Sequence, residues 1–269
     1  MKTNLLERTV ADVLDEALAA AGDELYVVDP MAGTIEDLVE VMGEGTPDVR
    51  LLASAGPLKT VMDDFIVSSR AADHVEAGRL EIRTHEDGAN TLLVTEDSVV
   101  AVVDAGDRVA GLATDDEAFV ESAYERFSTA WDEADAFDLR TPAISRVRDS
   151  LSDTLGDATA DDFDAVLGSL ETARGDGDGL DEVTISLLVA ARNEDLLYDI
   201  SKWGEDVGIA SKATFSRTKT RMEEMGLIDT EKVPIDVGRP RLRLKLGDER
   251  LRDADSGQLA SVAQSMLAV

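Results

Sequence analysis

The chain of 269 residues contains no cysteine, so disulfides, thiol catalysis and thiolate metal sites are excluded. Only two histidines are present, and no Gly-rich nucleotide-binding motif occurs. We therefore expect no catalytic residues, no metal site and no cofactor. No apolar run reaches the length of a membrane span, and the first residues soon turn acidic without a long apolar stretch. A cytoplasmic location with no membrane contact is the expectation.

Basic residues are scarce: 26 Lys and Arg stand against 57 Asp and Glu, a formal net charge of −31. Taken for the whole chain, that charge argues against a nucleic-acid partner. It is typical of a salt-adapted cytosol, as in haloarchaea, where a carboxylate-rich surface holds water and cations. The alternative explanation is an acidic interaction protein.

The acidic residues are unevenly distributed along the chain. Residues 1–191 hold 13 basic and 43 acidic residues, whereas residues 192–246 hold 11 basic and 10 acidic ones. Two stretches, Val207–Met222 inside this second segment and Val237–Gly247 at its end, contain basic residues and no acid at all. An anionic partner is the simplest reason for two such patches on a polyanionic protein.

Residues 1–136 alternate between helical and strand patterns and end in closely spaced apolar segments, which predicts an α/β domain with a mixed sheet. Asn4 is expected to cap a first helix, and Pro57 to start a long helix that reaches Val75. This domain is the candidate for effector sensing, dimerisation or both. A ligand pocket is conceivable at strand ends near Asp29, Ser54 and Asp104.

Residues 137–179 read as a helical linker ending in a Gly- and Asp-rich segment. That segment lacks an EF-hand pattern: with Asp176 as first ligand, Leu180 and Leu187 occupy positions that need oxygen donors. Residues 180–248 predict three helices followed by a β-hairpin, the parts of a winged helix-turn-helix. Residues 249–269 form an acidic, helical tail.

The third helix of this module is expected to begin after Ser211 as its cap and to end at Gly226. On a helical wheel, Phe215 and Met222 share the core face, and small or hydroxyl side chains with one Arg lie opposite. Such a face suits base edges in the major groove, with Lys and Arg on the flanks for phosphates. The expected DNA-contacting residues of this helix are Ser211, Lys212, Ala213, Ser216, Arg217, Lys219, Thr220 and Arg221. An ordinary solvated basic face is the alternative.

The returning hairpin strand alternates with period two, with leucines on one face and basic residues on the other. A compact basic tip beside it suits a minor groove or adjacent phosphates. The expected DNA-contacting residues of this wing are Arg239, Pro240, Arg241, Arg243 and Lys245. A basic edge that prevents strand aggregation is the alternative.

Three segments carry a resemblance to a known family: Asp64–Ser69, Leu196–Ile209 and Gly226–Arg241. Together they resemble the TbsP-type transcriptional regulators, related in layout to TrmB-type sugar-responsive regulators. The resemblance implies a cytoplasmic transcription factor that acts on carbon metabolism and has an N-terminal regulatory domain. TrmB-type sensor domains look like a degenerate phospholipase D fold, whose active members use a His-x-Lys signature. Here His74 and His85 stand in other contexts, so that chemistry is absent.

The sequence therefore predicts a transcriptional regulator that binds double-stranded DNA, with a possible metabolite effector. Because winged-helix regulators commonly read two half-sites, we also expect a homodimer, paired through the N-terminal domain or the helices between Ile144 and Thr172. A winged-helix module that binds an acidic protein without reading DNA is the competing function. A metabolic enzyme with an accessory C-terminal domain is a third hypothesis.

Overall fold

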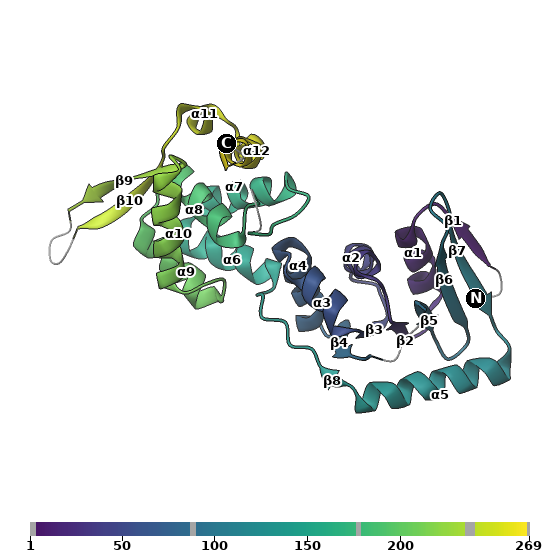
Figure 1. Ribbon diagram of the computed structural model, residues 1–269. Coiled ribbons are helices and arrows are strands. Elements are labelled where there is room, and N and C mark those ends of the chain that lie inside the picture. The colour runs from purple at the N-terminus through teal and green to yellow at the C-terminus, as the bar shows by residue number, and fades with distance from the viewer. Residues whose placement is uncertain (1–3, 87–89, 176–178, 235–239, 268–269) are drawn as a thin grey trace. The chain divides into compact units, whose positions relative to one another are not determined.

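The computed structural model describes residues 4–86, 90–175, 179–234 and 240–267 (Figure 1). The chain divides into two compact units, the first made of residues 1–63 and 70–139 and the second of residues 64–69 and 140–269. Each unit buries its own set of apolar side chains.

The first unit is built on a mixed sheet, whose strands within the described residues follow the order β1-β7-β6-β5-β2-β3-β4-β8. Pairing is parallel between β2 and β3 and between β3 and β4, and antiparallel elsewhere. The strands are β1 (Leu5–Glu7), β2 (Glu24–Val28), β3 (Asp48–Ala53), β4 (Leu80–Thr84), β5 (Leu92–Val94), β6 (Val99–Asp104), β7 (Val109–Thr114) and β8 (Asp135–Ala136). The predicted α/β domain with a mixed sheet is confirmed.

The helices that accompany this sheet are α1 (Val10–Ala20), α2 (Ala32–Val41), α3 (Ala55–Met62), α4 (Phe65–Glu76) and α5 (Glu117–Glu133). Helix α1 begins after Thr9, whose hydroxyl accepts from the Asp12 N–H while the Asp12 carboxylate accepts from the Thr9 N–H. The prediction of Asn4 as the cap was wrong: its side chain accepts from the N–H of Ala113 beside strand β1. A three-residue strand is too short to leave a recognisable sequence pattern.

The two faces of the sheet are covered differently. Val13 of α1 lies beside Gly111 of β7 on one face. On the other face, Phe127 and Trp131 of α5 pack with Tyr26 of β2. Helix α5 therefore covers the middle of its face, over β2 and β5.

The second unit consists of helices around a central helix, with one hairpin. Its elements are α6 (Ile144–Leu155), α7 (Asp157–Gly168), α8 (Glu182–Arg192), α9 (Leu197–Val207), α10 (Lys212–Glu224), β9 (Ile228–Val233), β10 (Arg241–Leu246), α11 (Glu249–Asp253) and α12 (Ser256–Leu267). Helices α8, α9 and α10 with the β9–β10 hairpin form the predicted winged helix-turn-helix arrangement.

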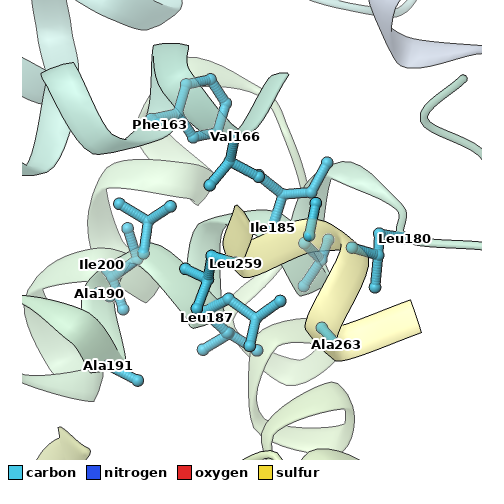
Figure 2. Close-up of a cluster of buried hydrophobic side chains, with 14 of the residues drawn as sticks. Phe163, Val166, Leu180, Ile185, Leu187, Ala190, Ala191, Ile200, Leu259 and Ala263 are labelled. Atoms are coloured by element: carbon cyan, nitrogen blue, oxygen red, sulfur yellow. The ribbon is translucent and has the colours of Figure 1, made fainter. Parts of the chain in front are cut away.

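The helix at the centre of this unit, α8, is mainly apolar and is buried on nearly every side from Val183 to Ala191, so it needs cover all round. Figure 2 shows Ile185 and Leu187 of α8 among side chains that include Phe163 of α7 and Leu259 of α12. The segments expected as a helical linker (137–179) and a tail (249–269) thus supply core of the second unit. On their own, α9, α10 and the hairpin would leave part of α8 exposed.

Residues 64–69, at the start of α4, also belong to the second unit. The Asp64 side chain is 1% exposed, lies 3.2 Å from Nε of Arg174, and accepts from the N–H groups of Ile66 and Ala173. Phe65 is part of the same apolar core. The single long helix predicted from Pro57 to Val75 is therefore wrong: α3 ends at Met62, before the buried Asp64.

Within the described residues, no helix combines the length and the apolar character needed to cross a membrane.

Candidate nucleic-acid interface

The turn between α9 and α10 is set by two glycines. Gly208 ends α9 with φ 95°, in the left-handed region that favours glycine. Gly204, buried within α9, contacts the ring of Phe215 so closely that a Cβ at position 204 would overlap it. Ser211 then caps α10 by accepting from the N–H of Thr214 at 3.2 Å. The two helices are thereby locked into a helix-turn-helix crossing.

Helix α10 turns its small and hydroxyl side chains outward, as predicted. Phe215 and Met222 are fully buried, which orients the helix on the unit. The exposed members of the predicted set are Ser211, Ala213, Ser216, Arg217, Thr220 and Arg221. They form one continuous outward surface, which we call the α10 face.

The cations of α10 fall into two groups by their partners. Arg217 donates to the Thr214 hydroxyl at 3.4 Å, and neither Arg217 nor Arg221 has an ion-pair partner among the residues that the structure describes. Lys212 is paired with Glu205 at 2.7 Å. Lys219 is paired with Glu223 at 2.7 Å, and its side chain is only 12% exposed. The two arginines are thus the cations of the α10 face.

Glu223 holds Lys219 toward the hairpin. Its carboxylate also accepts from the Thr230 hydroxyl of β9 at 2.7 Å. Burial raises the pKa of Glu223, but the hydrogen bonds from Lys219 and Thr230 outweigh burial and keep that pKa below its ordinary value. The structure therefore places Lys219, a predicted phosphate contact, at a helix–hairpin contact and away from the α10 face.

The hairpin pairs Arg241 with Val233 at one end and Leu246 with Ile228 at the other. Leu244 and Leu246 are buried, so the predicted alternation of β10 is confirmed. The connection before α9 joins the same sheet: Leu196 bridges to Arg243, and the N–H of Leu244 donates to the carbonyl of Asp195 at 2.9 Å.

Two basic residues of the wing, Arg241 and Lys245, have carboxylate partners within the unit. Arg241 lies 3.4 Å from the Asp199 carboxylate and 4.4 Å from the centre of the Tyr198 ring. Lys245 is paired with Glu231 at 2.6 Å. The guanidinium Nε of Arg243 is buried. Pro240 is exposed, and Arg239 lies outside the described residues.

Sequence reasoning did not select Lys232, which the structure leaves exposed on β9. It lies opposite Leu242, near the distal end of the hairpin. The sequence could have indicated Lys232 as a candidate DNA contact, because it is a basic residue within the segment where the acidic excess stops.

A half-buried carboxylate, that of Asp195, lies behind the wing. Asp195 accepts from the hydroxyl of Thr159, itself 2% exposed, at 3.0 Å. Burial raises the pKa of Asp195 from 3.8 to about 6; the Thr159 hydrogen bond opposes this and the negative charge of Asp199 adds to it. Asp195 is therefore expected to change its charge near pH 6.

The first unit holds the two histidines and the three residues considered for a pocket. In the described part of the chain, no group of three or more His, Asp or Glu side chains is placed to hold a metal ion. His74 is buried, and burial followed by the nearby Arg79 lowers its pKa. At the strand ends, the Ser54 hydroxyl approaches the Asp29 carboxylate at 3.4 Å, whereas Asp104 accepts from Gly106 N–H in the β6–β7 turn. The three residues considered for a pocket are thus not all brought together.

Comparison with known proteins gives two family matches that together span nearly the whole chain. The model described as "Transcriptional regulator TbsP-like, N-terminal" matches residues 2–142. The model described as "Transcriptional regulator TbsP-like, C-terminal HTH domain" matches residues 143–264. No curated protein matches the sequence.

Among solved structures, the archaeal chromatin protein TrmBL2 aligns at 16% identity and a TM-score of 0.37, over 51% of this chain and 54% of that one. The chain thus spans about half the length of TrmBL2. Nuc of Salmonella typhimurium, a phospholipase D family member, aligns at 10% identity and 0.36, over 50% and 97% of the two chains. NucT of Helicobacter pylori aligns at 11% and 0.34, over 50% and 99%. TM-scores this low do not establish that this chain shares the fold or the function of any of the three proteins.

Proposed function

The chain belongs to the TbsP-like transcriptional regulators, and on that premise we propose that its second unit binds double-stranded DNA sequence-specifically through the α10 face. The observation that carries this proposal is the exposure of Arg217 and Arg221, without ion-pair partners in the described chain, beside small and hydroxyl side chains. In a protein of net charge −31, such a face selects a polyanion.

The chemistry of the α10 face suits the major groove. Arg217 lies near the middle of the face and has the fork geometry that reads O6 and N7 of guanine. Ala213, Ser216 and Thr220 are short enough for the helix to approach base edges closely. Arg221, one turn after Arg217, is suited to a backbone phosphate.

The lysines that are paired with carboxylates contribute to DNA binding in a different way from Arg217 and Arg221. Lys212 and Lys245 are 43% and 40% exposed and pair with exposed carboxylates. Exposed pairs of this kind contribute little to stability, so a phosphate can replace the carboxylate at small cost. We propose that Lys212 adds a phosphate contact at the start of α10, and that Pro240, Arg241, Arg243 and Lys245, with Arg239 beyond the described residues, form a second contact through the wing. Lys219 stays with Glu223.

We also propose that the first unit regulates the second. Its separate core and its match to the N-terminal domain of a regulator family support a sensing or pairing role. The resemblance to sugar-responsive regulators supports carbon metabolism as the regulated process and a metabolite as effector. The acidic composition supports a salt-rich cytoplasm as the working environment.

The deciding experiment is a genome-wide map of bound DNA, followed by titration of the bound duplexes with purified protein in concentrated potassium salt. We expect a shared sequence motif and tighter binding to it than to scrambled duplex. Absence of duplex binding, together with capture of an acidic protein by the α10 face, would establish the competing protein–protein function.

A further inference from the structure

A small apolar cavity lies between helix α5 and the sheet of the first unit. Its volume is about 330 Å³, at the lower end of the range of about 300–1,000 Å³ that is usual for small-molecule sites. Strand pairing forms one wall: Ala101 of β6 stands between Leu92 of β5 and Leu112 of β7. Val99 and Thr114 make the next row of the same face. This wall is apolar except for Thr114.

Helix α5 supplies the opposite wall through a single stripe of side chains. These residues stand at i, i+3, i+4, i+7 and i+8, the spacing by which a helix turns one face toward a core. They are Phe119, Ser122, Ala123, Arg126 and Phe127. Position i+7 of such a stripe is ordinarily apolar, and here it is an arginine.

Arg126 is the charged residue of this cavity. Among the described lining residues it alone is charged, and no ion pair of the described chain includes it. Its guanidinium lies 5.4 Å from the centre of the Phe127 ring, which is part of the cavity wall. In a chain with 57 acidic residues, the positions three and four residues away along the helix are all uncharged. These positions are Ser122, Ala123, Thr129 and Ala130.

This lining suits an apolar molecule with one negative charge. A carboxylate accepts two parallel hydrogen bonds from a guanidinium, and the Ser122 hydroxyl, one turn earlier on α5, is a further donor in the lining. The apolar body of the molecule is stabilised by leaving water for the walls formed by Leu92, Leu112 and Phe127. A sugar fits poorly, because most of its hydroxyl groups would lose water without finding a partner on these walls.

We propose that this cavity binds a small apolar monocarboxylate, with the carboxylate on Arg126 and the apolar chain between α5 and strands β5, β6 and β7. At roughly 30 Å³ for each water-sized group, the cavity has room for about ten non-hydrogen atoms, the size of octanoate. The bound chain also covers Leu112 and Phe119, whose side chains are otherwise 48% and 55% exposed beside the cavity.

The site gives a chemical class to the effector of the first unit, and in that respect it rests on the proposed function. Occupancy itself depends on the first unit, which has its own apolar core. Binding to the cavity and the response of DNA binding are therefore measured separately.

The test is calorimetric titration of the full chain with potassium octanoate, below its micelle concentration, in concentrated potassium chloride. We expect one octanoate per chain, and binding of octan-1-ol weaker by about tenfold or more, because the alcohol lacks the charge-assisted hydrogen bonds. Arg126→Gln should weaken octanoate binding by a similar factor and leave the binding of octan-1-ol unchanged. Arg108→Gln, at an exposed arginine of the β6–β7 turn, is the matched control and should bind octanoate like wild type.

A second pair of variants tests the apolar part of the site. Ala101→Phe places a ring in the cavity, so it should abolish the binding of both octanoate and octan-1-ol. Ala101→Leu removes less of the volume and should weaken both in part, which keeps the test open should the larger side chain disturb folding.

Three results overturn the proposal: no octanoate binding by wild type, equal affinity for octanoate and octan-1-ol, or unchanged octanoate affinity in Arg126→Gln. Titration of a bound duplex with and without octanoate then tests the sensing role. Unchanged duplex affinity with octanoate bound keeps the site and removes the sensing role. Octanoate binding by a protein that binds no duplex keeps the site and removes the proposed function.

Discussion

Gly204 of α9 lies against the aromatic ring of Phe215 in α10, with no room between them for a Cβ. Both residues are buried, so neither the ring nor the helix backbone can move aside freely. This contact sets how closely the two helices of the helix-turn-helix approach each other.

Gly204→Ala is expected to destabilise the protein by about 1–3 kcal/mol, the usual cost of overpacking a core. The greater helix propensity of alanine offsets only part of this cost, about 1 kcal/mol. The measurement is denaturant unfolding in concentrated salt. Gly168→Ala at the end of α7 is the control, because nothing lies within 4 Å of its Cβ position. Equal stability of the two variants would contradict the close contact.

Arg217→Ala is expected to reduce discrimination between the true site and a site changed at one base pair, by about 1–3 kcal/mol. Binding to unrelated DNA should change less, because the lost contact is to a base edge. Titration of matched and mismatched duplexes measures the difference. Uniform weakening across all duplexes would reassign Arg217 to a phosphate.

Arg221→Ala is expected to weaken binding to all duplexes and to lower the salt dependence of affinity by about one counterion. Lys219→Ala should leave the salt dependence nearly unchanged, because Lys219 is paired with Glu223 and 12% exposed. The comparison requires a salt series, since at about 1 M salt the screening length falls to roughly 3 Å. Arg250→Ala, at an exposed arginine paired with Asp248, is the control. A larger salt effect for Lys219→Ala than for Arg221→Ala would reverse the assignment.

Asp195→Asn is expected to make the protein more stable near pH 7 and to change it little near pH 4. The folded-state pKa of Asp195 is raised to about 6 by burial, so the native state holds its proton more tightly than the unfolded state does. This stabilisation is complete below the unfolded pKa of about 3.9 and is lost as pH rises through about 6. Asparagine keeps an oxygen acceptor for the Thr159 hydroxyl and removes the titration.

The measurement is the unfolding midpoint as a function of pH at fixed salt. Asp161→Asn, at an exposed carboxylate on α7, is the control and should retain the pH dependence between 4 and 6 of wild type. If Asp195→Asn retains it too, another group is responsible.

Asp64→Ala is expected to destabilise the second unit by about 3 kcal/mol or more, because it leaves the largely buried Arg174 without its carboxylate. It also removes the acceptor for the N–H groups of Ile66 and Ala173. Asp64→Asn should cost less, since the amide oxygen still accepts. Calorimetry of both variants gives the order, and equal losses would show that the charge itself matters more than the backbone hydrogen bonds.

The amino-acid sequence by itself determined the local features of the DNA-binding module. Gly208, the Ser211 cap and the apolar spacing of Phe215 and Met222 act within one or two turns, so their effect can be read from neighbours in the chain. The alternation of β10 and the mixed sheet could likewise be predicted from the order of apolar and polar residues along short segments of the chain. Lys219 and Glu223 stand at i and i+4, so their pairing was also open to prediction.

The tertiary structure alone decided what depends on distant partners. Arg241 meets Asp199 across 42 residues of chain, and Gly204 is constrained by a ring that only helix packing brings near. The helices expected as a linker cover α8, because a helix with apolar residues on most of its sides is stable only when it is enclosed. The exposure of Leu6, Val103 and Leu112 likewise depends on where α5 ends over the sheet. Local propensity does not contain these relations, because burial and ion pairing are set by how separate elements pack.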